Sequence, residues 1–498
     1  MSTDEARTSS GPGTRHASRA RISLSRTWTA TAVLVPALVI SLLPLQAIDL
    51  AYQLRAGALM LDRGALLRVD EFTLLATGRP WLNQQWGSQV LLELTFRGGG
   101  WFGLALLRSL LVATTAGFVY LACRASGATA RAAAMLTLTG ALFFQGGFAL
   151  RPQLLGMVCF GATLWLVADR RQHRGRFLLV VPIVAVWANL HGSFVLGPIA
   201  IGLGAVQDLA ERDSLLPRTV LVGLAATAAT LLNPLGPHVW SYVWDLTNNP
   251  VIARTIQEWR RPTLDPREGI RFGFSLAFFV TVVAAVVFVA RSGARPRWPL
   301  MLALVAFAVP GFDSIRGIFW WGMAAPVVVA QALPRERRVH EASGPVNLVN
   351  TAIVIVLCLI PAVGVLRWLP YRDGSLPPQA MMSFAPFAVT EELRSTLEPG
   401  EPFFNAQLWG SWFEFALPDH PVVSDSRIEV IPGTAWNDYL AVSRAGEGWQ
   451  STLDRWGIRV VALRRDQQAP LIAAMQDDPG WTETLETPEG AVFVRTEP

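Results

Sequence analysis

The stretch that decides the fold, residues 48–101, reads IDLAYQLRAGALMLDRGALLRVDEFTLLATGRPWLNQQWGSQVLLELTFRGGGW. It follows an apolar segment, residues 28–48, that is long enough to cross a bilayer as a helix. Asp49 therefore stands where this helix is expected to leave the membrane, and Asp70 and Glu71 follow one short amphipathic helix later. The stretch predicts an acidic outer loop, residues 49–100, on a helical membrane protein.

The composition places the chain among polytopic membrane proteins. Of its 498 residues, 52% are hydrophobic and only 16% are charged, whereas soluble domains carry about 25% charged residues. We expect a multi-pass protein of the plasma membrane that contacts membrane lipids, and the net charge of +5 indicates membrane topology rather than nucleic-acid binding. The three cysteines lie in apolar runs without CxxC spacing, which predicts neither disulfides nor a metal site.

Apolar runs predict about eleven transmembrane helices between residues 28 and 370. Residues 1–27 are rich in arginine and read as a disordered cytoplasmic tail. The even-numbered connections between the helices are short and dense in arginine, as the positive-inside rule requires of cytoplasmic loops. They include residues 124–131, 169–176, 212–218, 291–297 and 334–340. With an odd number of helices, the C-terminal region then lies outside the cytoplasm.

Residues 371–498 have the pattern of a small extracytoplasmic α/β domain. We expect helices near 388–397, 409–417, 434–456 and 468–476, strands at 403–405, 421–425 and 458–464, and a closing hairpin over 482–495. The fold class predicted is thus an α-helical membrane bundle with a soluble α/β domain attached.

Acids on the outer face are the first candidates for chemistry. Asp49 could act as a catalytic base that takes a proton from an acceptor hydroxyl, or it could simply mark the end of a helix. Asp70 and Glu71 could hold a divalent cation that neutralises a departing phosphate, or Asp70 could cap a turn.

Other polar residues on this face are candidates for binding a substrate. Arg151 and Arg316 begin apolar spans and could hold a lipid phosphate, or extend to lipid headgroups. His191 could contact the substrate or be a packing residue, and Glu258 and Trp259 could bind a sugar or form a plain loop. Gln153 and Asn189 complete the candidate set, whereas Asp425 and Arg427 read as a structural ion pair.

Several motifs carry a family resemblance that covers nearly the whole chain from residue 28. They are VDEFTLLATGRPWLNQQW, RPQLLG, WANLHGSF, LLNPLGP, QEW, SIRG and FNAQLWGSWFEFALPDHPVVSDSR. In this order they resemble bacterial polytopic proteins related to the GT-C glycosyltransferases, which use polyprenyl-phosphate sugars. The resemblance implies a helical bundle with Asp49 as the catalytic acid and Asp70 as the second acidic position.

The sequence departs from the family pattern at two places. Where relatives read Trp-Trp-His after the acid, this chain has Ala51, Tyr52 and Gln53, and Gln85 stands where a glutamate commonly precedes the second tryptophan. A divalent cation is therefore only a candidate cofactor, and the metal ligands stay unassigned.

The function predicted is an inverting membrane glycosyltransferase that moves a sugar from a polyprenyl-phosphate donor to an envelope acceptor. Asp49, Asp70 and His191 form the predicted catalytic set, and Glu71 joins the residues predicted to bind substrate. Two alternatives stay open: a non-catalytic envelope scaffold, and a carrier of lipid-linked intermediates. A carrier would need ionisable residues at mid-depth, for which Arg108 is the nearest candidate.

Overall fold

A computed structural model describes residues 22–45, 48–249, 256–334 and 348–496. The N-terminal tail and the 334–340 loop, apart from their inner ends, lie outside these residues. Each of the eleven apolar segments predicted from the sequence contains a helix in its described part, although several of these helices end before the predicted boundary. The corresponding helices are α1 (Leu24–Leu42), α3 (Trp86–Ala125), α4 (Ala130–Phe144), α5 (Pro152–Asp169), α6 (Val180–Leu190), α7 (Leu196–Ala210), α8 (Leu216–Ala229), α11 (Ile270–Arg291), α12 (Trp298–Asp313), α13 (Ile315–Ala332) and α14 (Leu348–Leu366).

Within the described residues, six helical stretches are long and apolar enough to cross a membrane. They are Leu24–Leu42, Trp86–Ala125, Pro152–Asp169, Gly192–Ala210, Ile270–Arg291 and Leu348–Leu366. Three shorter apolar stretches, Arg176–Leu190, Leu216–Leu232 and Trp298–Asp313, pack among them. The protein is therefore a multi-pass membrane protein. The number of eleven membrane spans stays a prediction, as does the side of the membrane on which each helix end lies.

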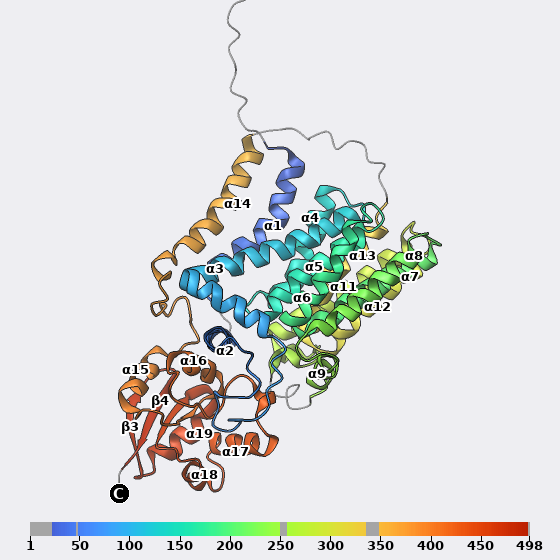
Figure 1. The fold of residues 1–498 in the computed structure, drawn as a ribbon. Coiled ribbons are helices and arrows are strands. Elements are labelled where there is room, and N and C mark those ends of the chain that lie inside the picture. Colours follow the sequence, from blue (N-terminus) through green and yellow to red (C-terminus); the bar gives the residue numbers. More distant parts are fainter. Residues whose placement is uncertain (1–21, 46–47, 250–255, 335–347, 497–498) are drawn as a thin grey trace, which may run out of the picture.

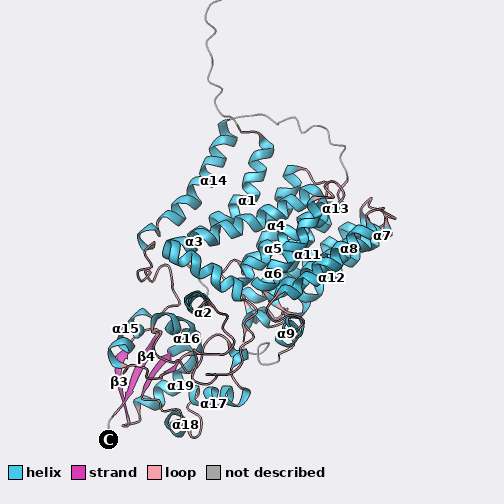
Figure 2. Cartoon of the chain, in the orientation of Figure 1, coloured by secondary structure: helices cyan, strands magenta, loops and turns pink. Residues whose placement is uncertain are grey.

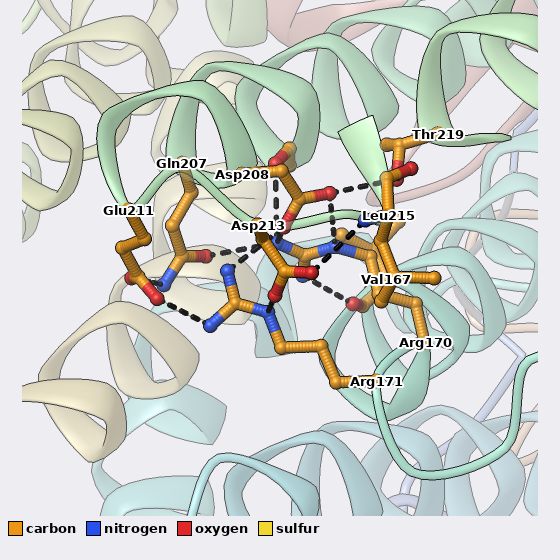
Figure 3. A network of polar contacts seen from close by, with 10 residues as sticks. Val167, Arg170, Arg171, Gln207, Asp208, Glu211, Asp213, Leu215 and Thr219 are labelled. Atoms are coloured by element: carbon orange, nitrogen blue, oxygen red, sulfur yellow. Dashed lines mark hydrogen bonds and ion pairs between the residues drawn. The ribbon is translucent and has the colours of Figure 1, made fainter. Parts of the chain in front are cut away.

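Two of the arginine-rich connections, residues 169–176 and 212–218, adjoin each other at one end of the bundle. Arg218 donates to the carbonyl of Arg174, and the guanidinium groups of Arg170 and Arg171 converge on the buried carboxylate of Asp208, at 2.7 and 2.8 Å. Thr219 adds a hydrogen bond of 2.7 Å to the same carboxylate, as Figure 3 shows. This network fastens the ends of α5, α7 and α8 together, which gives these arginines a structural role in addition to the effect on topology predicted from the sequence.

Arg108, the mid-depth candidate for a carrier, caps a helix instead. Its guanidinium donates to the carbonyls of Ile40, Leu43 and Pro44 at 2.9, 2.6 and 2.6 Å. These carbonyls lie at the C-terminal end of α1 and just beyond it, where a helix leaves its last carbonyls short of backbone donors. The Ile40 carbonyl also accepts a hydrogen bond from the Leu43 amide at 3.2 Å. Arg108 therefore serves the packing of α1 against α3.

Helix α3 bends at the glycine triplet that the sequence places before Trp101. Gly100 has φ +53° and ψ −145°, a conformation that residues with a Cβ rarely adopt. A Cβ built on it would lie 2.4 Å from the carbonyl oxygen of Tyr371. The backbone leading into the C-terminal domain thus packs directly on the bend, and the first half of α3 can lie against α2 (Leu50–Arg63).

Figure 1 shows α2 between the helical bundle and the C-terminal domain, and Figure 2 shows that the strands drawn lie in that domain. Its sheet has the order β1-β2-β4-β3, with β1 and β2 parallel and the other pairs antiparallel. The elements are α15 (Phe387–Thr396), β1 (Phe404–Asn405), α16 (Gln407–Ala416), α17 (Gly433–Ser443), α18 (Trp449–Arg455), β2 (Val460–Arg464), α19 (Arg465–Gln476), β3 (Trp481–Glu486) and β4 (Gly490–Arg495).

Two details of this domain differ from the prediction. The helix expected over 434–456 is divided into α17 and α18, because Ala445 and Gly448, which lie between them, take positive φ values of 51° and 76°. The strand expected at 421–425 is reduced to single bridges, in which Val422 pairs with Phe403 and with Thr73 of the first outer loop. Leu74 donates to the carbonyl of Val422 at 2.7 Å, so this outer loop joins the C-terminal domain by backbone hydrogen bonds.

Candidate active site

A cavity of about 530 Å³ lies where the helical bundle, α2 and the C-terminal domain meet. Residues from distant parts of the sequence line it. They include Asp49, Tyr52, Gln53, Gln85, Arg151, Gln153, His191, Tyr242, Glu258, Trp259, Arg316, Gln407, Arg427, Glu429 and Gln467. Most of the candidate residues from the sequence therefore share one cavity, together with residues that the sequence had not indicated.

Asp49 enters the cavity from the start of α2. It precedes the helix but makes no side-chain cap bond, so its carboxylate is not used by the backbone of α2. Asp49 Oδ2 lies 3.7 Å from Arg151 Nε. Arg151 has an extended backbone immediately before Pro152, the first residue of α5, because a proline disfavours helical geometry in the preceding residue. This local geometry directs the two side chains toward each other.

Glu258 bridges Arg151 to Arg316. Arg151 Nη1 lies 3.0 Å from both carboxylate oxygens of Glu258, and Arg316 Nη2 lies 2.7 Å from one of them. Burial alone would raise the pKa of Glu258, but the two guanidinium groups outweigh it and hold the pKa below its usual range. Glu258 is therefore ionised at neutral pH.

Arg316 is held by two further features of its surroundings. Ser314 caps α13 by accepting a hydrogen bond from the Gly317 amide at 3.1 Å, which fixes the first turn on which Arg316 lies. The Arg316 guanidinium also lies over the Trp259 ring, 5.1 Å from its centroid. Trp259 thus supports a cation in the cavity wall.

His191 separates α6 from the helical turn Gly192–Val195 and presents its ring to the cavity. Its Nδ1 accepts a hydrogen bond from the backbone amide of Ser193 at 3.1 Å. A nitrogen that accepts carries no proton, so we infer the neutral ring with its proton on Nε2. His191 can then donate a hydrogen bond to a bound molecule.

Among the glutamines that line the cavity, three were singled out in the sequence and add neutral polar groups to its wall. Gln153 is buried, and its Nε2 has no hydrogen-bond partner among the residues that the structure describes. Gln53 and Gln85, two of the positions at which the sequence departs from the family pattern, are neighbours, with Gln53 Nε2 donating to Gln85 Oε1 at 3.4 Å. The two departures therefore affect one place in the cavity.

The structure places three candidate residues away from the cavity lining. Asp70 is fully buried and pairs with Arg427 at 2.8 Å, while its second oxygen accepts from the amide and hydroxyl of Thr73. Glu71 forms a surface ion pair with Arg63, with both nitrogen–oxygen distances at 2.7 Å. Asn189 accepts from Trp86 Nε1 at 2.9 Å and so fastens α6 to the start of α3. All three have structural partners, which argues against direct contact with a substrate.

Arg427 connects the C-terminal domain to the first outer loop. The expected pair with Asp425 is present, with Arg427 Nε 2.6 Å from Asp425 Oδ2. The fully buried guanidinium also lies over the rings of Tyr52, Phe72 and Trp81, at 5.3, 4.7 and 4.5 Å from their centroids. Part of Arg427 lines the cavity, so the contact between the C-terminal domain and the first outer loop forms one wall of the cavity.

Glu429 is a cavity carboxyl that the sequence did not reveal. It lies two residues beyond the last motif of the resemblance, in the single turn Ile428–Val430. Its side chain is exposed to the cavity but surrounded by protein on its other sides, and this desolvation, with the nearby Asp425 and Asp49, raises its pKa to about 7. No periodicity marks such a residue, since it reaches the cavity only through the packing of the two domains.

The residues present do not form a recognisable metal site. Among the described residues, no group of three or more histidine, cysteine, aspartate or glutamate side chains is arranged to hold an ion. Asp49 and Glu429 supply carboxylates to the cavity, but Glu258 is occupied by two arginines. We therefore derive no chemical step through a metal.

Comparison with known proteins identifies the fold. No protein-family model matches the sequence, and no curated protein does either. Among solved structures, the chain is similar to the oligosaccharyltransferase AglB from Archaeoglobus fulgidus in complex with an inhibitory peptide and a dolichol-phosphate, with a TM-score of 0.55 and 13% identity over 95% of this chain and 75% of that one. It is also similar to the arabinofuranosyltransferase AftD from Mycobacteria, with a TM-score of 0.52 and 17% identity over 96% of this chain and 40% of AftD.

Both proteins are GT-C glycosyltransferases. The chain has the GT-C fold. At these identities the likeness concerns the fold alone, and the chain spans less than half of AftD. The GT-C fold confirms the fold that the motif resemblance implies, and the small C-terminal α/β domain agrees with it.

Proposed function

We propose that the chain is a membrane glycosyltransferase that moves a sugar from a polyprenyl-phosphate donor to an acceptor bound in the cavity on the outer face. One observation carries the proposal: a carboxylate, an imidazole and two guanidiniums, supplied by residues 49, 191, 151 and 316, line a single cavity. The GT-C fold supports the same class of reaction, and the donor class comes from the motif resemblance.

Asp49 acts as the base in this proposal. It takes the proton of an acceptor hydroxyl, whose oxygen then bonds to the anomeric carbon of the donor sugar. The bond between that carbon and the phosphate oxygen breaks, and its electron pair leaves with the lipid phosphate. Attack from the side opposite the leaving phosphate inverts the anomeric configuration.

Arg151 and Arg316 hold the phosphate of the donor in this scheme. Guanidinium groups are permanently charged and match phosphate oxygens with two parallel hydrogen bonds. His191 donates from Nε2 to the donor or acceptor, and Gln153 offers an amide that lacks a described partner. Asp70 has no step here, because it is buried in its ion pair with Arg427.

The experiment incubates the purified protein with a panel of polyprenyl-phosphate sugars and measures transfer or hydrolysis. We expect Asp49→Asn to abolish product while membrane insertion and thermal unfolding stay unchanged. Asp62→Asn is the matched control, because Asp62 lies on the same helix with a side chain that is 60% exposed and pairs with Arg97 at 2.7 Å. Wild-type turnover by Asp49→Asn would remove the base from the proposal.

A further inference from the structure

The Glu258 carboxylate occupies the centre of the cluster that the proposed function assigns to phosphate. Arg151 spans both of its oxygens at 3.0 Å, and Arg316 approaches the second oxygen at 2.7 Å. A phosphate group would be bound by the same guanidinium nitrogens, Arg151 Nη1 and Arg316 Nη2, because guanidinium N–H groups donate to carboxylate and phosphate oxygens alike. Glu258 and a phosphate therefore need the same positions.

The charges of the cluster lead to the same conclusion. Two guanidiniums face Glu258, with Asp49 3.7 Å from Arg151 Nε. The phosphate of the donor, esterified to both lipid and sugar, brings one further negative charge, and the lipid phosphate monoester that remains after transfer carries about −1.5 to −2 at neutral pH. With Glu258 still in place, the incoming phosphate would meet an ionised carboxylate at hydrogen-bond distance from its own ligands, and like charges so close repel each other strongly.

We propose that Glu258 is an internal counter-ion that pairs with Arg151 and Arg316 when no donor is bound, and that the donor phosphate must displace it. This inference rests on the proposed function, in which these arginines hold phosphate. Phosphate can bind only to those molecules in which the Glu258 carboxylate has left the arginines. The apparent affinity for phosphate is therefore the intrinsic affinity multiplied by the fraction of such molecules. Glu258 thereby also keeps two partly buried guanidiniums paired in the absence of donor.

Glu258→Gln gives a test in which the direction of the effect is decisive. Glutamine preserves the size of the side chain but cannot neutralise the arginines, so we expect undecaprenyl phosphate to bind the purified full-length protein roughly tenfold more tightly. Native mass spectrometry in detergent or microscale thermophoresis measures the Kd. If Glu258 instead contacted the donor sugar, the same change would weaken binding, and weaker or unchanged binding overturns the proposal.

The controls separate the phosphate effect from others. Glu429→Gln removes a carboxylate from the same cavity that has no described contact with either arginine, and we expect a change in Kd of less than about threefold. Undecaprenol, which lacks the phosphate, should bind the wild type and Glu258→Gln equally, and a tenfold gain for undecaprenol would overturn the proposal. Inorganic phosphate forms a third arm: a gain for it supports a site for the phosphate group alone, whereas a gain confined to the lipid supports a site for a lipid headgroup.

Two further measurements keep the proposal falsifiable. Should Glu258→Gln fail to fold, Glu258→Asp retains the charge on a side chain one methylene shorter, and we expect an intermediate gain of about threefold. Its absence overturns the proposal. If the wild type binds undecaprenyl phosphate no better than undecaprenol, the proposed function is itself refuted. If the wild type binds undecaprenyl phosphate but neither Glu258→Gln nor Glu258→Asp binds it more tightly, only the counter-ion role of Glu258 is refuted.

Discussion

Replacing Asp70 with asparagine tests whether this acid belongs to the chemistry or to the packing of the first outer loop against the C-terminal domain. Asp70 is fully buried, pairs with Arg427 at 2.8 Å, and accepts two hydrogen bonds from Thr73, at 3.0 and 2.7 Å. An asparagine at this position would preserve the shape of the side chain but leave the buried guanidinium with one charged partner fewer. Sequence and family resemblance predict a loss of transfer, whereas the structure predicts a loss of stability.

The magnitude follows from the burial of both partners. Arg427 and Asp70 have side-chain exposures of 2% and 0%, and breaking a buried ion pair costs about 3–5 kcal/mol. Asp425 stays beside Arg427 at 2.6 Å and limits the loss of stability. We therefore expect the free energy of unfolding to fall by about 3 kcal/mol. For a domain of the size of the C-terminal domain, this lowers the unfolding midpoint by roughly 10 °C. Differential scanning fluorimetry of the purified protein measures the midpoint, and limited proteolysis tests whether the loop around Asp70 has loosened.

Glu71→Gln is the matched control for this experiment. The neighbouring acid pairs with Arg63 at the surface, where the two side chains are 32% and 47% exposed. Exposed ion pairs contribute about 0–1 kcal/mol, so this variant should unfold within about 2 °C of the wild type. An Asp70→Asn protein that unfolds like the wild type but has lost transfer would refute the structural role and restore Asp70 to the chemistry.

Three further predictions concern other parts of the molecule. Asp208→Asn weakens both arginine contacts at the opposite end of the bundle and should lower the unfolding midpoint more than Glu211→Gln, whose carboxylate is partly exposed. Gly100→Ala should destabilise the junction with the C-terminal domain, because its Cβ would meet the Tyr371 carbonyl, whereas Gly99→Ala meets nothing within 4 Å and serves as control in the same thermal assay. The pKa of Glu429 is raised to about 7 from an ordinary 4.5, so the folded protein binds this proton more tightly than the unfolded chain does. The resulting stabilisation is complete below about pH 4.5 and is lost as the pH rises through 7. Unfolding midpoints measured over a pH series should therefore change less with pH for Glu429→Gln than for the wild type.

The helical part of the fold could be predicted because apolar runs and arginine-rich loops are local features of a sequence. Each of the eleven segments contains a helix where it is described, and the same pattern predicts that Asp49, Arg151, His191 and Arg316 approach one end of the bundle. Helix ends at prolines, at glycines and at the capping serine then determine the backbone positions from which these side chains extend.

What the sequence could not reveal depends on contacts between residues far apart along the chain. Asp70 and Arg427 are separated by more than 350 positions, and a buried acid looks the same in a single sequence as an acid in a cavity. Glu429 reaches the cavity because the C-terminal domain covers it, and no local spacing records that packing. Glu258 was predicted as a sugar ligand for the same reason: its sequence neighbours do not include the two arginines that hold it.

The two ends of the bundle use arginine in different ways, and this difference supports an anion site at the cavity. At the arginine-rich end, Arg170 and Arg171 face three carboxylates, those of Asp208, Glu211 and Asp213, so the cluster has no capacity for another anion. At the cavity, Arg151 and Arg316 share the carboxylate of Glu258, and among the described residues only Asp49, 3.7 Å from Arg151 Nε, adds a second one. Positive charge paired to excess acid stabilises a fold, whereas two guanidiniums that share one displaceable carboxylate can exchange it for the phosphate of a ligand.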